Sequence, residues 1–186
     1  MRIIAGKHKG RTIKTIKGTA TRPTLDKVRE AVFNILGQYF DGGVALDLFA
    51  GSGALGIEAV SRGIDKCIFV DVNFEAIKVI KENLKSLGIE SSEVIKGDAL
   101  KALDGVLKNY QFDLVFLDPP YHKNLINTVL CKLIDNNLLK KEAVVVVESS
   151  KEENFIERYK SITFQKSYLY GITKIAIYKN VGDDYE

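Results

Sequence analysis

The sequence predicts an α/β fold built on a mostly parallel sheet of seven strands, with helices on both faces and the last strand antiparallel. Between residues 44 and 147, short apolar runs alternate with helical patterns, which is typical of parallel strands joined by helices. Two later apolar runs, 162–169 and 172–178, are separated by two residues, and so short a connection requires an antiparallel hairpin. A glycine-rich corner at 50–53 follows the first apolar run.

The composition suits one globular unit with an N-terminal appendage, since the chain has 186 residues and is 46% hydrophobic. We therefore assign residues 1–40 to a basic extension and 41–186 to the main domain. No apolar run approaches the roughly 20 residues that span a bilayer, and the N-terminus lacks a signal-peptide core, so we expect a cytoplasmic protein without membrane contact. Two isolated cysteines and two histidines predict neither a disulfide nor a metal site. No apolar surface stripe is left over, so we expect a monomer.

The charge is distributed unevenly along the chain. Residues 1–30 contain nine Lys and Arg residues against two acidic residues, whereas the rest contains 18 basic against 22 acidic residues. A basic segment on a mildly acidic domain is typical of an arm that binds a polyanion such as nucleic acid. A solvated lysine-rich surface is the alternative explanation.

The elements follow in order. Alternation over residues 1–18 predicts a β-hairpin with Lys7, His8 and Lys9 at its tip, where His8 would contact phosphate or solvent. Thr24 is the expected cap of a helix that reaches Tyr39 and ends before 41–43. The remaining strands are expected at 44–48, 67–70, 93–96, 113–117 and 143–147. The remaining helices are expected at 54–62, 74–87, 99–109, 122–139 and 152–159.

The glycine corner is the first candidate binding site. It leaves backbone N–H groups at a helix N-terminus and at the carboxyl end of a parallel strand, where open α/β sheets bind ligands. Gly51, Gly53 and Gly56 with Asp71 also fit a dinucleotide fingerprint. However, the carboxylate of Asp47 would repel a pyrophosphate and attract a cationic ligand such as S-adenosylmethionine. Asp47 could instead only cap local N–H groups.

A second candidate site follows the strand at 113–117, where the chain reads Asp118-Pro119-Pro120-Tyr121. Two prolines remove two N–H donors and fix the backbone, which leaves only acceptors. Asp118 and the Pro119 carbonyl could each accept a proton of an exocyclic amine while the Tyr121 ring stacks on its base. A turn that merely ends a strand is the alternative.

These motifs resemble the class I S-adenosylmethionine-dependent amino-methyltransferases, which share D-L-F-A-G-S-G and D-P-P-Y segments. More narrowly, the blocks at residues 2–11, 22–36 and 112–121 resemble the RsmD family, which methylates the N2 amine of a guanine in small-subunit (16S) ribosomal RNA. The resemblance covers nearly the whole chain and implies a Rossmann-like class I methyltransferase fold. It also implies rRNA or the small ribosomal subunit as partner and S-adenosyl-L-methionine as cofactor.

The resemblance also implies residue roles. Asp118, Pro119, Pro120 and Tyr121 would hold the guanine amine. The cofactor would lie against Asp47, Ala50, Gly51 and Gly53 at its methionine end, Asp71 at its ribose, and Asp98 and Ala99 at its adenine. Asp71 departs from the glutamate that is common in the family. The residues implied to bind RNA are Arg2, Lys7, His8, Lys9 and Arg11. Arg22 and Thr24 would close over the cofactor or the flipped base.

Three other functions fit parts of the sequence. A nicotinamide- or flavin-linked oxidoreductase would use the glycine spacing but leaves Asp47 and the basic arm unexplained. A non-catalytic RNA-binding module would need a degraded pocket, whereas every motif acid is present. A methyltransferase of another amine, such as adenine N6 or a glutamine side chain, differs only in substrate, and the resemblance alone selects guanine.

Overall fold

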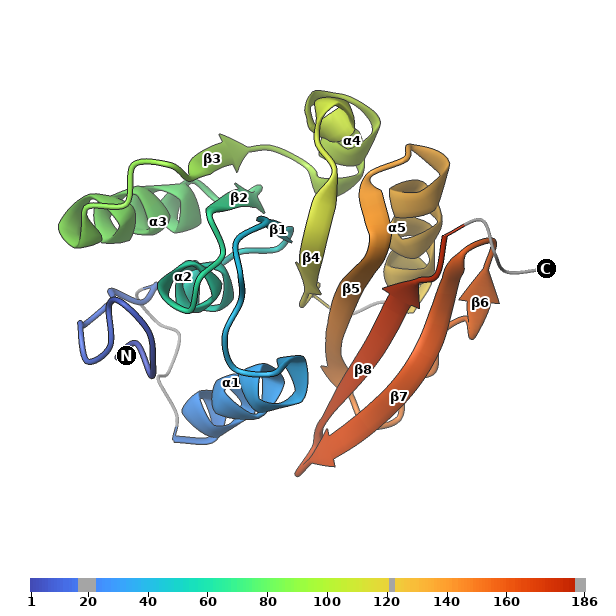
Figure 1. Ribbon diagram of the computed structural model, residues 1–186, viewed down its shortest axis with the longest axis horizontal. Helices are drawn as coiled ribbons and strands as arrows, with labels where there is room; N and C mark the ends of the chain where they lie inside the picture. The colour runs from blue at the N-terminus through green and yellow to red at the C-terminus, as the bar shows by residue number, and fades with distance from the viewer. Residues whose placement is uncertain (17–22, 121–122, 183–186) are drawn as a thin grey trace. The chain divides into compact units, whose positions relative to one another are not determined.

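The computed structural model describes residues 1–16, 23–120 and 123–182, which form two compact units (Figure 1). The first unit is Met1–Gly97 and the second is Asp98–Glu186. Each unit is a layer of strands with helices packed on it, so the predicted α/β class is confirmed.

The first unit contains three parallel strands in the order β3-β2-β1. Its elements are α1 (Pro23–Leu36), β1 (Val44–Asp47), α2 (Ala54–Ser61), β2 (Lys66–Asp71), α3 (Phe74–Leu87) and β3 (Glu93–Lys96). The central residues of β1 and β2 are fully buried, and α2 and α3 pack against β2. The carboxyl ends of the three strands therefore lie at one edge of this layer.

Residues 1–16 pair with themselves as a hairpin. Arg2 and Thr12 form an antiparallel bridge, and the N–H of Ile3 donates to the Arg11 carbonyl at 2.9 Å. This confirms the predicted hairpin as far as Ile13, whose N–H donates to the Met1 carbonyl, whereas Lys14 bonds to Asn83; residues 17 and 18 lie outside the described part of the chain.

The second unit has the strand order β4-β5-β8-β7-β6. Its elements are α4 (Ala99–Asp104), η1 (a 3₁₀ turn, Val106–Asn109), β4 (Phe112–Leu117), α5 (Lys123–Asp135), β5 (Leu139–Ser150), β6 (Arg158–Tyr159), β7 (Ile162–Tyr170) and β8 (Thr173–Asn180). β5 runs parallel to β4, while β8 is antiparallel to both β5 and β7. The long β7–β8 hairpin, orange to red in Figure 1, confirms the predicted reversed last strand.

The predicted helix at 152–159 is wrong. That segment contains a turn and then β6, which brings the strands of the described residues to eight instead of seven. Groups distant in sequence hold it extended: the Tyr178 hydroxyl donates to the Ile156 carbonyl at 2.7 Å, and Asn127 accepts the Ile156 N–H at 3.0 Å. These contacts outweigh the local helical pattern.

Other helix bounds also differ from the prediction. The helix predicted at 122–139 is α5, which ends at Asp135, and Leu139 begins β5. α1 begins at Pro23, so Thr24 lies inside the helix and is not its cap. The same helix ends at Leu36, before Tyr39, because Gly37 and Gln38 adopt positive φ of 99° and 70°. The predicted helix at 99–109 is interrupted at Gly105, whose backbone (φ −130°, ψ −100°) divides α4 from η1.

None of the helices within the described ranges is long and apolar enough to cross a bilayer.

Candidate functional site

The glycine corner of the first unit is built around the carboxylate of Asp47. This residue ends β1 with 3% of its surface exposed, and its Oδ2 accepts the Gly56 N–H at 3.1 Å. Asp47 therefore ties the first turn of α2 to the end of β1, as the capping alternative requires. A contact with a cationic ligand stays a prediction.

Asp71 holds the same corner from the neighbouring strand. Its Oδ2 accepts the Gly51 N–H at 2.9 Å and its Oδ1 accepts the Asn73 N–H at 2.8 Å. The backbone of the loop is also bonded to β2, because the Ala50 N–H donates to the Val70 carbonyl. The structure thus brings together five predicted cofactor residues of this unit: Asp47, Ala50, Gly51, Gly53 and Asp71.

The glycines of the corner have different roles. A Cβ on Gly56 would lie 2.4 Å from the Phe69 ring and 2.6 Å from the Cys67 sulfur, so Gly56 permits close packing of α2 on β2. Gly51 has φ +57°, and a Cβ built there would meet nothing within 4 Å. The backbone at Gly51 is therefore open to a ligand, and a buried carboxylate at Asp47 suits a cationic one. These residues fit S-adenosylmethionine.

The other predicted cofactor residues belong to the second unit. Asp98 caps α4, since its Oδ1 accepts the Lys101 N–H at 3.0 Å. Ala99, the first residue of that helix, is buried. Because only Oδ1 is used for the cap and Asp98 is exposed, its other carboxylate oxygen could accept a hydrogen bond from the exocyclic amine of an adenine.

Asp118 directly follows β4, at the carboxyl end of this strand. Burial of β4 from Leu114 to Leu117 fixes the direction in which the chain leaves the sheet. Pro119 and Pro120 follow at once and supply no N–H donor. The described part of this segment thus offers oxygen acceptors at the strand end, as predicted.

The electrostatics of Asp118 are unusual for an aspartate. Asp118 is exposed as a residue, yet desolvation by the protein around its carboxylate raises its pKa from 3.8 to about 6. Desolvation disfavours the ionised form, which explains the upward direction. A carboxylate with this pKa is ionised at neutral pH and still able to take up a proton.

Residues 1–16, the described part of the basic arm, are anchored by Glu58, which was not predicted from the sequence. Glu58 lies on α2 and is fully buried, and its two oxygens accept the N–H groups of Ile4 at 2.8 Å and Ala5 at 3.1 Å. Arg62 donates to the same carboxylate at 2.9 Å, and Arg29 Nη1 lies 3.9 Å away. A lone acid inside the apolar helix ALGIEAVS was the available signal.

Two more side chains hold the arm by its backbone. Ser61 Oγ donates to the Ala5 carbonyl at 2.7 Å and accepts the His8 N–H at 3.0 Å. Asn83 of α3 accepts the Lys14 N–H at 2.8 Å and donates to the Lys14 carbonyl at 3.0 Å. Because these bonds use the backbone, the side chains of the arm stay available.

The predicted RNA-contacting side chains of the arm are therefore displayed on a fixed backbone. Arg2, Lys7, Lys9 and Arg11 are exposed, although Arg11 also donates to the Ser86 carbonyl at 2.9 Å. Burial and the charges of Lys7 and Arg11 lower the pKa of His8, which favours the neutral ring. Arg22 and Tyr121 lie outside the described residues, and Thr24 is known only by its backbone position in α1.

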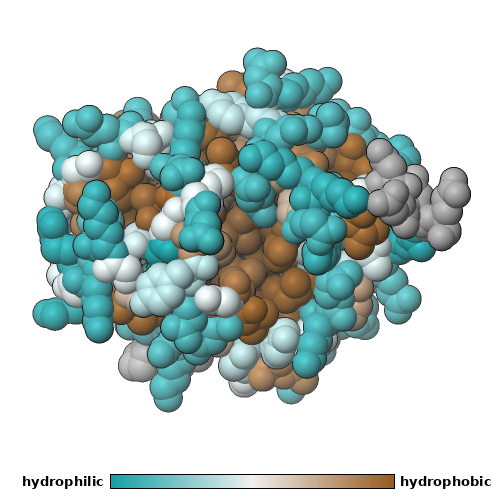
Figure 2. Space-filling model, viewed as in Figure 1, coloured by the Kyte–Doolittle hydropathy of each residue, from teal (hydrophilic) through white to brown (hydrophobic). Residues whose placement is uncertain are grey.

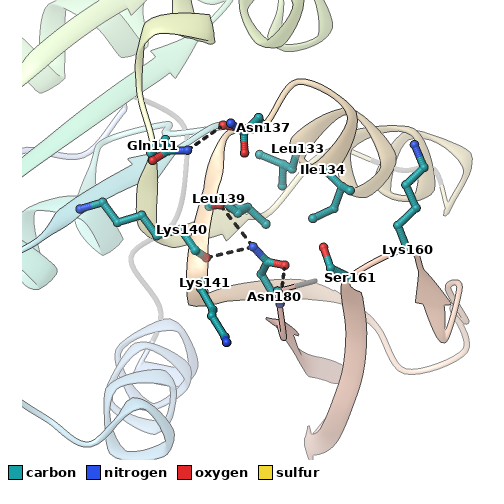
Figure 3. A pocket seen from close by; sticks show the side chains of 11 residues that line it. Gln111, Leu133, Ile134, Asn137, Leu139, Lys140, Lys141, Lys160, Ser161 and Asn180 are labelled. Atoms are coloured by element: carbon teal, nitrogen blue, oxygen red, sulfur yellow. Dashed lines mark hydrogen bonds between the residues drawn. The ribbon is translucent and has the colours of Figure 1, made fainter. Parts of the chain in front are cut away.

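A cavity of about 490 Å³ in the second unit lies elsewhere (Figure 3). It is lined by Lys140, Lys141 and Lys160 around Asn180, and it sits where β4 and β5 begin, opposite the end that leads to Asp118. Lys140 pairs with Asp113 and Lys160 with Asp135, while Asn180 donates to the Leu139 and Lys140 carbonyls. The polar side chains of Lys140, Lys160 and Asn180 that line this cavity are thus already engaged in bonds within the protein. In the described ranges no group of three His, Cys, Asp or Glu side chains could hold a metal ion.

Comparison with known proteins agrees with this geometry. Residues 1–179 match the family described as "Conserved hypothetical protein 95". The "Putative rRNA methyltransferase YlbH" of Bacillus subtilis is 45% identical over 98% of this chain and 100% of its own length. The "Ribosomal RNA small subunit methyltransferase D" of Haemophilus influenzae is 38% identical over 97% of this chain and 94% of its own. The chain belongs to the RsmD family.

A solved structure extends the likeness to the fold. The "Putative methyltransferase yhhF" of Escherichia coli superposes with a TM-score of 0.84 at 30% identity, covering 97% of both chains. The class I methyltransferase fold is therefore confirmed, and a more distant structure with this fold, at 17% identity and a TM-score of 0.66, was solved in complex with AdoMet. The oxidoreductase alternative has no support among these relatives.

Proposed function

We propose that this protein transfers a methyl group from S-adenosylmethionine to the exocyclic N2 amine of a guanine in small-subunit ribosomal RNA. The observation that carries the proposal is the end of β4, where a carboxylate of raised pKa is followed by two prolines. The names of the relatives support rRNA as the substrate class.

The proposed cofactor contacts follow the family resemblance residue by residue. In the first unit, Asp47, Ala50, Gly51 and Gly53 would bind the methionine end of the cofactor and Asp71 its ribose hydroxyls. Each oxygen of Asp71 already accepts one backbone N–H, and a carboxylate oxygen can accept a second bond. Asp98 and Ala99 of the second unit would contact the adenine.

Asp118 would act on the substrate amine. An aromatic amine is a poor nucleophile because its lone pair is delocalised into the ring. Acceptors on both N–H bonds, Asp118 and the Pro119 carbonyl, favour a pyramidal nitrogen and direct its lone pair. When bound, S-adenosylmethionine supplies an electrophilic methyl group on a sulfonium. As the amine becomes cationic, its proton passes to the Asp118 carboxylate, which at a pKa of about 6 is mostly ionised at pH 7. Tyr121 would stack on the guanine.

The arm would bind RNA before that step. Lys7, Lys9 and Arg11 would contact phosphates, and anchoring by Glu58 and Ser61 means that little order has to be gained on binding. Phosphate contacts of this kind position the RNA but do not read its sequence. The chain outside the arm must therefore recognise the target nucleotide.

The test is methyl transfer from labelled S-adenosylmethionine to rRNA, supplied as free RNA and as small subunits that lack the modification. Nucleoside analysis of the product should give N2-methylguanosine, and Asp118→Ala should give none. N6-methyladenosine would show another amine substrate. No label in either RNA, with cofactor binding demonstrated, would contradict an rRNA methyltransferase.

A further inference from the structure

Residues 158–182 form a basic segment, as the N-terminal arm does, although three acidic residues follow within 183–186. Residues 158–182 contain five cationic residues and no acidic one: Arg158, Lys160, Lys166, Lys174 and Lys179. Lys160 and Lys179 pair with Asp135 and Glu142. In the described part of the chain, Lys166 and Lys174 form no ion pair, although Lys174 Nζ donates to the Glu153 carbonyl and to Asn154 Oδ1. Both lysines lie in the half of the β7–β8 hairpin that includes its turn.

This outer half carries aromatic residues in register with a lysine. The pairing shifts at a bulge between Phe164 and Lys166. After the bulge, Lys166, Tyr168 and Tyr170 are two residues apart and therefore lie on the same face of β7. Lys166 Nζ lies 5.1 Å from the Tyr168 ring centroid, which agrees with that arrangement. Both tyrosines are partly exposed, less so than Leu169 between them. Their separation of about 6.8 Å along the strand is twice the ~3.4 Å spacing of stacked bases.

The turn itself exposes large aliphatic side chains. Leu169 is 63% and Ile172 is 78% exposed, and the two flank Tyr170 and Gly171. In Figure 2 pale and brown side chains gather at the lower centre of the face, where the tip of this hairpin lies in Figure 1. An apolar tip between two lysines is suited to stacking and wedging against bases, as nucleic-acid-binding surfaces do.

The register places the tip at the same end of the second unit as Asp118. Leu117 pairs with Val147, which pairs with Ala176, which pairs with Ser167. The next residue along, Tyr168, is therefore level with Asp118 across three strand spacings, about 14 Å. Tyr170 and the turn extend farther in the direction of the strand end.

We propose that Lys166, Tyr168 and Tyr170, with Leu169 and Ile172 at the turn, form a stacking platform for unpaired RNA bases that flank the methylated nucleotide. The inference rests on the proposed function, because it concerns the RNA of that reaction. Phosphates would lie near Lys166 and Lys174, and bases would stack on the two rings. A target guanine has to leave its own stack, and its neighbours need a surface of this kind.

The first test measures the affinity of the full chain for free small-subunit rRNA. Loss of stacking costs ~1–3 kcal/mol per base, so each of Tyr168→Ala and Tyr170→Ala should weaken binding about 5- to 150-fold. Tyr168→Phe with Tyr170→Phe should restore it, whereas leucine at both positions should not, because leucine keeps the apolar bulk without the ring. Tyr39→Ala removes a 62% exposed aromatic of the first unit and should change nothing. Thermal unfolding and cofactor affinity of all variants should match the wild type.

A second test reports the contact directly. The chain has no tryptophan, so Tyr170→Trp places a single indole at the tip. Its fluorescence should be quenched by RNA with the same midpoint as RNA binding, and Tyr39→Trp should stay unquenched.

The outcomes separate the two proposals. A wild-type protein that neither binds nor methylates rRNA contradicts the proposed function. A wild-type protein that does both, while Tyr168→Ala and Tyr170→Ala bind equally well and the indole is not quenched, overturns only the stacking platform. Weakened binding to assembled subunits with unchanged binding to free RNA overturns it too, since that result assigns the tip to a ribosomal protein.

Discussion

Asp71 and Asp118 stand at the carboxyl ends of parallel strands, yet their carboxylates have different surroundings. Asp71 accepts two backbone N–H groups, from Gly51 and Asn73. Within the residues that the structure describes, Asp118 accepts no such bond, and desolvation raises its pKa to about 6. The position at a strand end therefore does not determine the role of an acid. Bonds to the chain hold Asp71 in the glycine corner, whereas the proposed function assigns Asp118 to the substrate amine.

Glu58 is the acid of the three that makes the most contacts with the rest of the protein. Its carboxylate accepts two N–H groups of the arm, lies against two arginines and is fully buried. Ordered from Glu58 through Asp71 to Asp118, the three acids do progressively less for the fold. Their replacement should therefore have a decreasing effect on stability.

Glu58→Ala should have the largest effect. Removing it leaves Arg62 buried without its counter-charge and Arg29 with Asp26 alone, which costs about 3–5 kcal/mol in the free energy of unfolding. Urea unfolding measures that loss. Glu30→Ala, on the exposed side of α1, is the matched control and should stay within about 0.5 kcal/mol of the wild type. A wild-type stability for Glu58→Ala would mean that the arm is not anchored by this cluster.

Asp71→Ala should have an intermediate effect. The part-buried N–H of Gly51 loses its acceptor, at about 1–3 kcal/mol, while the exposed N–H of Asn73 can bond to water, and the corner loosens. Calorimetry should show cofactor affinity at least about tenfold lower. Asp71→Glu, which introduces the common residue of the family, should retain most of the affinity. Equal affinity for Asp71→Ala and wild type would exclude Asp71 from cofactor binding.

Replacing Asp118 should change the stability least of the three acids, and its role should appear instead in the pH dependence of the rate. The pKa of Asp118 in the folded protein, about 6, is higher than the ordinary aspartate value of 3.8, so its carboxyl group is largely protonated below about pH 6. The single-turnover rate should fall about tenfold per pH unit below pH 6 and stay level above it, while cofactor affinity stays constant. A rate that stays level down to pH 5 would show that the ionised carboxylate is not required.

The same shift affects stability in the opposite sense. Between about pH 3.8 and 6 the folded protein binds more protons at Asp118 than the unfolded chain, so this group lowers stability as pH rises. Asp118→Asn should therefore be at least as stable as the wild type at pH 7. A clear loss of stability would place Asp118 with Glu58 and Asp71 among the structural acids.

Local signals predicted the elements that local chemistry governs. α3 begins and ends as expected because Asn73 caps it and Gly88 stops it in the left-handed conformation. β3 likewise has the predicted bounds. In contrast, β5 is longer than the predicted 143–147, because β8 pairs with it as far as Ser150. Its partner is too distant in sequence for a pattern to reveal.

The same distinction applies to the candidate site. The acids at strand ends could be named from the sequence, since a strand-ending acid beside glycines or prolines is a local pattern. Their bonding could not, because it depends on which N–H groups the fold brings near: Asp71 reaches 20 residues back to Gly51, and Glu58 reaches 53 residues to Ala5. The role of Glu58 was therefore missed.

The most direct measurement of the central claim compares turnover and cofactor binding in Asp118→Asn. Asparagine keeps the shape but cannot take up the amine proton. We predict that methyl transfer falls by about 10³-fold or more, while the Kd for S-adenosylmethionine stays within twofold of the wild type. A parallel loss of both would contradict a division between acids that build the binding corner and one that acts on the substrate.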